Sequence, residues 1–224
     1  MPPEHKHFLC YVTDMGALAS GFVHSAAGSA SEDCRRALVE KIAKAAGAGI
    51  NWVQIREKTI EARALAELLR LAVAASRGTR TSILVNDRLD VALAAGASGV
   101  HLGEASLPVE AVAEWRRSAG RPEFLIGVSC HSREAAQAAA MAGADYIFFG
   151  PVFATPSKAA FGAPQGIERL REVCRAVRVP VLAIGGITLE NAHSCFAAGA
   201  AGIAAIRLFQ ESEDVSAIVK HLLE

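Results

Sequence analysis

Eight short apolar runs recur along the chain, separated by alanine-rich segments. The runs span residues 7–14, 51–58, 81–87, 99–103, 124–130, 146–152, 179–186 and 202–207. Most are almost continuously apolar, which is typical of strands covered on both faces in a parallel sheet. The segments between them place apolar residues at helical spacing, as in IEARALAELLRLAVAAS. The alternation therefore predicts a right-handed series of βα units.

Eight strands favour a closed sheet over an open one. An open doubly wound sheet normally has fewer strands and a topological switch point, and the Gly-Gly pair at 185–186 lacks the spacing of a Rossmann fingerprint. A length of 224 residues suits one α/β barrel domain. We therefore predict a single-domain (β/α)8 TIM barrel over residues 1–224. An extended loop at about 16–31 follows the first strand, and we expect it to form a lid or a disordered bulge at the mouth.

Charge balance and cysteine usage narrow the functional classes. The chain has 23 Lys and Arg residues against 23 Asp and Glu residues. This balance argues against a nucleic-acid surface, which requires a basic excess. No run of about 18 apolar residues is present, so no membrane span is expected. Five scattered cysteines without metal-ligand spacing are typical of reduced thiols, and we expect a cytoplasmic protein.

Polar residues gather where the predicted strands end. Active sites of (β/α)8 barrels lie at this end, in the loops that lead into the helices. The residues found there are Gln54, Arg56, Glu57, Lys58, Asn86, Asp87, Arg88, His101, Glu104, Ser129, His131, Thr155, Ser157, Lys158, Gly185, Gly186 and Arg207. Arg56 and Lys58, two residues apart on one predicted strand, are expected to face the same side.

Three cations in this set, Arg56, Lys58 and Lys158, favour a phosphate ligand. Arginine offers a planar fork of donors and lysine offers a point charge. Asp87 beside them is most simply explained as a Mg2+ ligand, since Mg2+ bridges carboxylate and phosphate oxygens. The sequence therefore predicts a site for small phosphorylated molecules.

Each of these features also has a simpler explanation. Arg56–Lys58 is compatible with a solvated strand end, and Asn86–Asp87 with the N-cap of the next helix. His101, between two apolar neighbours, is compatible with a hydrogen-bonded core histidine, and Gly185–Gly186 with a tight turn. Their joint position at one end of the predicted barrel is what favours the phosphate site.

Six motifs resemble the family of thiamine phosphate synthase and thiazole tautomerase. They are VQIREK (53–58), LVNDRLDVALAAGASGVHLG (84–103), GVSCHS (127–132), GPVFATPSK (150–158), PQG (164–166) and AIGGIT (183–188). The likeness runs in order from Tyr11 to about Phe209, so it covers nearly the whole chain. It implies a TIM barrel that acts on small phosphorylated substrates.

For the synthase branch, the resemblance implies that hydroxymethylpyrimidine diphosphate condenses with thiazole phosphate, or its carboxylate, to give thiamine phosphate and pyrophosphate. Departure of the diphosphate leaves a pyrimidine cation that the thiazole nitrogen attacks, and this departure needs the charge stabilisation that Mg2+, Arg and Lys supply. The residues that match the pyrimidine diphosphate site are Gln54, Arg56, Lys58, Asn86, Ser129 and Lys158. The residues that match the thiazole phosphate site are Thr155, Pro156, Ser157, Gly185, Gly186, Ile206 and Arg207. Asp87 matches one of two Mg2+-binding aspartates.

The sequence departs from the family pattern at two positions. Ser106 stands where the family has its second Mg2+-binding aspartate, and Glu104, two residues earlier, is the candidate replacement ligand. Without such a replacement, Mg2+ keeps more of its own water molecules. Arg207 stands where the family usually has serine, and it either binds the thiazole phosphate by charge-assisted bonds or fills the pocket.

Two other functions stay open at this point. The thiazole tautomerase needs a proton shuttle, and His131 matches its catalytic histidine, a residue suited to acid–base work that many synthases also carry. The diphosphate set of Lys58, Asn86, Asp87 and Lys158 favours the synthase. A non-catalytic relative that binds thiazole or thiamine phosphate is the third alternative. The sequence leaves open the oligomeric state, a homo-oligomer included, and the preference between thiazole tautomers.

Overall fold

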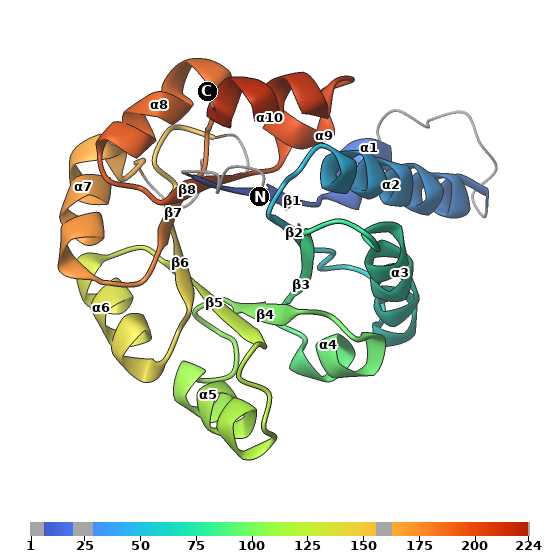
Figure 1. Cartoon of the computed structure of the whole chain (residues 1–224), viewed down its shortest axis with the longest axis horizontal. Helices are drawn as coiled ribbons and strands as arrows, with labels where there is room; N and C mark the ends of the chain where they lie inside the picture. The colour runs from blue at the N-terminus through green and yellow to red at the C-terminus, as the bar shows by residue number, and fades with distance from the viewer. Residues whose placement is uncertain (1–6, 20–28, 156–162, 224) are drawn as a thin grey trace.

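The structure is a computed structural model that describes residues 7–19, 29–155 and 163–223. Its parallel strands each pair with the next, and the sheet closes into a barrel where β8 pairs with β1 (Figure 1). The strands are β1 (Phe8–Val12), β2 (Trp52–Ile55), β3 (Ser82–Asn86), β4 (Gly99–Leu102), β5 (Leu125–Cys130), β6 (Tyr146–Phe149), β7 (Val181–Ile184) and β8 (Gly202–Ala205). The predicted (β/α)8 TIM barrel is confirmed.

Helices surround the barrel on its outside (Figure 1). They are α1 (Met15–Ala19), α2 (Ser29–Gly47), α3 (Ala62–Ala75), α4 (Leu89–Ala95), α5 (Val109–Ser118), α6 (Arg133–Ala142), α7 (Gly166–Ala176), α8 (Leu189–Ala197), α9 (Arg207–Gln210) and α10 (Val215–Leu223). The α3 segment is helical because Leu65, Leu68, Leu69 and Ala72 recur at intervals of three and four residues and form one buried face. None of the described helices is long and apolar enough to cross a membrane.

The core has two parts, one inside the barrel and one between the barrel and its helices. Successive side chains of a strand point to opposite faces, so alternate residues fill the interior. The apolar residues of the interior are Cys10, Val12, Trp52, Leu84, Tyr146, Phe148, Leu182 and Ala204. The intervening strand residues pack with the apolar faces of the helices. A filled interior holds the strand ends in fixed positions, and these ends carry the predicted site residues.

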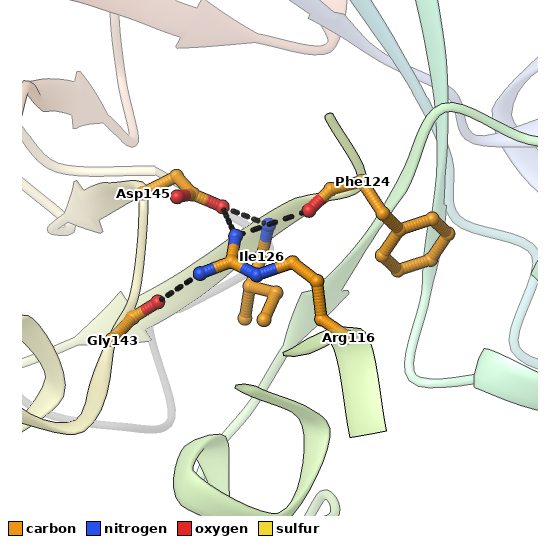
Figure 2. Close-up of polar contacts among 5 residues, drawn as sticks. All are labelled: Arg116, Phe124, Ile126, Gly143 and Asp145. Atoms are coloured by element: carbon orange, nitrogen blue, oxygen red, sulfur yellow. Dashed lines mark hydrogen bonds and ion pairs between the residues drawn. The ribbon is translucent and has the colours of Figure 1, made fainter. Parts of the chain in front are cut away.

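A polar cluster connects three segments at the N-terminal ends of β5 and β6 (Figure 2). The Arg116 guanidinium, from α5, donates to the carbonyl oxygens of Phe124 at 3.1 Å and Gly143 at 3.3 Å, and it pairs with Asp145 at 2.5 Å. The Asp145 carboxylate also accepts the Ile126 N–H at 2.7 Å. We call these contacts the Arg116–Asp145 clamp. Because the Arg116 side chain is only 18% exposed, the clamp compensates a charge that is largely removed from water.

The structure corrects three boundaries expected from the sequence. β2 ends at Ile55 because the Arg56 N–H donates to the Thr13 hydroxyl instead of a strand partner, so Lys58 lies in a turn and shares no strand face with Arg56. Arg207 begins α9 rather than ending β8. Helices α1 and α2 occupy both ends of the loop predicted at 16–31, and residues 20–28 lie outside the described ranges.

Candidate active site

Side chains from β2 and β3 meet at the C-terminal mouth of the barrel. Gln54 is buried, and its Nε2 donates to Asn86 Oδ1 at 3.1 Å. Asn86 Nδ2 donates in turn to Asp87 Oδ2 at 2.7 Å. Both amides are therefore oriented by their neighbours, and the Asp87 carboxylate stands at the end of a fixed chain of donors.

Asp87 has a backbone conformation that few side chains adopt. Its φ of +62° is the one positive φ among the described residues other than glycine, and aspartate tolerates this region better than most residues. The Asp87 N–H donates to the His101 carbonyl oxygen at 2.9 Å. Arg88 takes the N-cap position of α4, so the helix-cap explanation of Asn86–Asp87 is wrong. The Asp87 side chain bonds instead to the loop after β4.

That loop offers a hydroxyl and an N–H group where a second carboxylate was expected. The Ser106 Oγ donates to Asp87 Oδ1, because a carboxylate can only accept. The Gly103 N–H lies 2.6 Å from Ser106 Oγ and 3.3 Å from Asp87 Oδ1. Ser106 therefore orients Asp87 and adds no charge.

Glu104 and His131 form a separate pair at the same mouth. The Glu104 carboxylate is 70% exposed and lies 4.0 Å from His131 Nε2. His131 Nδ1 contacts the Gly150 carbonyl oxygen, so Nδ1 carries the proton and Nε2 is the nitrogen that faces Glu104. The contacts of the described residues thus place Glu104 with His131 and not with Asp87.

The two described cations of the predicted diphosphate site, Arg56 and Lys58, differ from Arg88 at the same mouth. Arg56 is half-buried and Lys58 is exposed. Within the described ranges, neither of these side chains makes a hydrogen bond or an ion pair, whereas Arg88 pairs with Asp90 at 2.6 Å. Lys158, the third predicted cation, lies outside the described residues. Arg56 and Lys58 are thus available to an anionic ligand.

Glu57 belongs to a buried network that the sequence reasoning missed. Its carboxylate accepts from Thr13 Oγ1 at 2.6 Å and from the Met15 N–H at 2.9 Å, and Thr13 Oγ1 also accepts the Arg56 N–H at 3.0 Å. The pKa of the Glu57 carboxyl is raised above its ordinary value, because the effect of burial exceeds the opposite effect of these hydrogen bonds. The network fixes the backbone that carries Arg56. Its only sequence signal is the acidic residue between two cations in VQIREK, which also suits a solvated strand end.

A second buried network lies one layer deeper. The fully buried His101 contacts the Tyr146 hydroxyl through Nδ1 at 3.0 Å and Ser129 Oγ through Nε2 at 2.9 Å. Burial lowers the pKa of His101 to about 3, so the imidazole is neutral at physiological pH. The interpretation of His101 as a hydrogen-bonded core histidine is therefore correct, but its Nε2 partner is a predicted site residue. Tyr146 carries no motif signal because an apolar strand accommodates tyrosine as readily as phenylalanine.

The predicted thiazole phosphate side lies around the ends of β7 and β8. Gly185 and Gly186 have φ of +94° and +66°, and a Cβ at Gly186 would approach the Ala154 carbonyl oxygen to 2.5 Å, so both positions require glycine. Thr155 and Ile206 are half-buried, and Arg207 is exposed. Pro156 and Ser157 lie outside the described residues. Arg207 is thus the one cation of the predicted set that the described residues place on this side.

The donor set at Asp87 fits a Mg2+ ion held by one protein carboxylate. No three acidic, histidine or cysteine side chains gather into a metal cluster within the described part of the chain. Three donors occupy Asp87, two of them on Oδ1, which leaves Oδ2 with a lone pair to offer. Mg2+ commonly takes one or two carboxylates, with water and substrate phosphates as its other ligands. The residues present therefore suit this mode of binding better than an all-protein cage.

A hollow of about 460 Å3 lies elsewhere on the surface and contains none of the predicted site residues. Arg35 from α2 and Glu67, Arg70 and Leu71 from α3 line it. The convergence of polar groups at the barrel mouth, and not the size of this hollow, identifies the candidate site.

Comparison with known proteins identifies the family of the chain. The profile of the family described as thiamine monophosphate synthase matches residues 28–209. The thiamine-phosphate synthase of Methanoregula boonei is 43% identical over 214 residues, which cover 96% of this chain and 91% of that protein. The thiamine-phosphate synthase of Moorella thermoacetica is 40% identical over 189 residues, covering 84% and 88%. Among solved structures, the thiamine phosphate pyrophosphorylase from Pyrococcus furiosus superimposes with a TM-score of 0.76 at 32% identity, over 97% of this chain and 94% of that one.

Proposed function

The chain belongs to the thiamine monophosphate synthase family, and on this premise we propose that it is a transferase that makes thiamine phosphate. Its substrates are hydroxymethylpyrimidine diphosphate and a thiazole phosphate, and pyrophosphate is the second product. The names of the relatives support the synthase and give no support to the tautomerase. The observation that supports the proposal is that a fixed carboxylate and two cations, which have no partner among the described residues, follow the ends of neighbouring strands at the same mouth.

The diphosphate half of the site uses groups that are already oriented. The Glu57–Thr13 network holds the backbone of Arg56, and its guanidinium fork matches the oxygens of a phosphate. Lys58 adds a second positive charge, and we assign Lys158 to the same role from the sequence. Gln54 and Asn86 present fixed amides to the pyrimidine diphosphate, since each is held by its neighbour.

Asp87 is the residue that we propose to hold Mg2+, through the lone pair left on Oδ2. Ser106 and the Gly103 N–H keep the carboxylate oriented from the Oδ1 side. When bound, Mg2+ would neutralise charge on the departing diphosphate. Glu104 is not part of this set in our proposal, because its contact is with His131.

The thiazole half uses the Gly185–Gly186 turn and the segment from Ile206 to Arg207. Barrels of this class frequently bind phosphate with the loops after β7 and β8 and a short extra helix, which is the position of α9. Arg207 has no serine-like hydroxyl to offer, and we propose that its exposed guanidinium closes on the thiazole phosphate by charge-assisted bonds.

The reaction needs no nucleophilic side chain and no general base. The bond between the pyrimidine methylene carbon and the diphosphate oxygen breaks, and its electron pair leaves with the diphosphate. The lone pair of the thiazole nitrogen then forms the new C–N bond. No proton moves in either event, so the cations of the mouth act by stabilising the charge that develops on the leaving group.

The test is incubation of the purified chain with Mg2+, hydroxymethylpyrimidine diphosphate and either thiazole phosphate or its carboxylated form, from which the carboxylate would leave as CO2. We expect thiamine phosphate and pyrophosphate in equal amounts, and we expect Asp87→Asn, which preserves the shape of the side chain, to abolish both. Isomerisation of the carboxylated thiazole without condensation, lost in His131→Ala, would instead establish the tautomerase. Binding without either reaction would establish a non-catalytic relative.

A further inference from the structure

Three interior side chains form a hydrogen-bonded row from the barrel centre to its mouth. Tyr146 on β6 contacts His101 on β4, and His101 contacts Ser129 on β5. The strand register places Gly127 opposite both His101 and Tyr146, so Ser129 lies two residues nearer the C-terminal ends. Tyr146 and His101 are buried to within 1% exposure, while Ser129 is half-buried. The row therefore starts in a closed interior and ends where a ligand can reach it.

Packing fixes the inner end of this row. The Trp52 ring lies 4.5 Å from the Tyr146 ring, centroid to centroid, on one side. Gly127 lies against the Tyr146 ring and hydroxyl on another side, where any Cβ would overlap them. The Phe148 ring lies 4.2 Å from the His101 ring. Neither ring can turn away to find another partner, so the two hydrogen bonds of His101 have one arrangement of partners.

The positions of the protons along the row follow from which groups can donate and which can accept a hydrogen bond. A buried tyrosine hydroxyl needs an acceptor, and among the described residues the one within hydrogen-bond distance is His101 Nδ1. Nδ1 must then lack a proton, so the one proton of the imidazole is on Nε2. The Nε2–H donates to Ser129 Oγ. One of the two lone pairs of Ser129 Oγ is thereby engaged, and the hydroxyl hydrogen is left to point to an acceptor at the mouth.

We propose that Tyr146 and His101 are positioning residues that make Ser129 a hydrogen-bond donor to the departing diphosphate. This inference rests on the proposed function for the identity of the ligand. A donor aimed at an oxygen that gains charge as the C–O bond breaks strengthens in the transition state more than in the ground state. Loss of the alignment should therefore lower kcat more than it raises KM for the pyrimidine diphosphate.

The first measurement reads the tautomer without any catalysis. In the chain labelled with 15N-histidine, we expect the His101 signal, assigned by its loss in His101→Gln, to show a protonated Nε2 and an unprotonated Nδ1. Tyr146→Phe, which keeps the ring against Trp52, should relax this to a mixture of tautomers. A protonated Nδ1 in the wild-type protein would overturn the proposal. Because this measurement needs no substrate, it decides the proposal even if no thiamine phosphate is formed.

The second measurement is a double-mutant cycle on turnover. We expect Tyr146→Phe to lower kcat roughly tenfold in the wild-type background, and to change it by no more than about twofold in the Ser129→Ala background. The matched control is Tyr11→Phe, which removes another buried hydroxyl, bonded to Gln210 Oε1 at 3.0 Å, and should have the same effect in both backgrounds. Equal effects of Tyr146→Phe in the two backgrounds would mean a merely structural role and would overturn the proposal.

Discussion

The two ends of the barrel differ in whether their charged side chains have partners within the described part of the protein. At the N-terminal ends of β5 and β6, the Arg116–Asp145 clamp joins a guanidinium, a carboxylate, two carbonyl oxygens and one N–H within the protein (Figure 2). At the C-terminal mouth, Arg56 and Lys58 have no such partner among the described residues. Breaking a charge pair that is largely removed from water destabilises the fold, whereas a charge at the mouth without a partner among the described residues is available to a ligand. We therefore attribute a contribution to folding stability to the N-terminal end of the barrel and propose that the reaction takes place at the C-terminal mouth.

The largest expected effect is on stability, at the clamp. Asp145→Ala leaves the mostly buried Arg116 without its counter-charge and the Ile126 N–H without its acceptor. We expect the free energy of unfolding, measured by urea titration, to fall by about 3–5 kcal/mol. The control is Asp90→Ala, which breaks the exposed pair with Arg88 and should cost less than about 1 kcal/mol. Similar costs for the two variants would contradict the assignment of stability to the clamp.

The next largest effect is on activity, at the mouth. We expect Arg56→Ala to lower kcat/KM for the pyrimidine diphosphate by about 10²–10³-fold, because it removes a donor aimed at developing charge. Its free energy of unfolding should change by less than about 0.5 kcal/mol, since the guanidinium has no hydrogen-bond or ion-pair partner to lose among the described residues. Arg56→Lys, which keeps the charge and removes the fork, should give an intermediate rate. A strong loss of stability in Arg56→Ala would mean that Arg56 supports the fold as the Arg116–Asp145 clamp does, and would contradict the proposed difference between the two ends.

A third effect concerns pH and the buried His101. The pKa of His101 is lowered to about 3 in the folded protein, whereas the ordinary pKa of a histidine is about 6.5. Between these two pH values, His101 is therefore protonated in the unfolded chain and neutral in the folded one. The contribution of neutral His101 to stability is therefore fully present above pH of about 6.5 and is lost as the pH falls toward 3. We expect this to add about 1.4 kcal/mol per pH unit to the slope of stability against pH in that window. His101→Gln should flatten the slope measured by urea titration at several pH values, and an unchanged slope would contradict a neutral His101.

The smallest expected effect separates the two candidate neighbours of the metal. Ser106→Ala removes the donor that orients Asp87, and we expect the Mg2+ concentration for half-maximal activity to rise roughly fivefold. Glu104→Gln should leave that concentration unchanged, because Glu104 contacts His131. If Glu104→Gln raised this Mg2+ concentration more than Ser106→Ala did, Glu104 would be identified as a metal ligand and Ser106 would have no role in metal binding.

The fold was predictable because the barrel interior and the helix faces both leave a pattern in the sequence. Continuous apolar runs indicate strands buried on both sides, and the presence of eight such runs favours a closed sheet over an open one. Boundaries were less predictable, since the end of β2 is set by a hydrogen bond from Arg56 to Thr13, which is distant in sequence. The extension to Lys58 was wrong for this reason.

The site was predictable where its residues stand in motifs at strand ends, as with Gln54, Asn86 and Asp87. The same approach missed residues whose role depends on contacts between distant strands. The half-buried Glu57 and the buried Tyr146 each bond to another strand or its following loop, and neither is marked by its neighbours in sequence. The role of Ser106 as a donor to Asp87 likewise follows only from the loop geometry.

The most direct test of the account is the yield of thiamine phosphate from hydroxymethylpyrimidine diphosphate and thiazole phosphate in the presence of Mg2+. We predict one pyrophosphate for each thiamine phosphate with the wild-type chain and with Asp90→Ala, and a rate lower by about 10²–10³-fold with Arg56→Ala at unchanged stability. Absence of product from the folded wild-type chain, or full activity of Arg56→Ala, would contradict it.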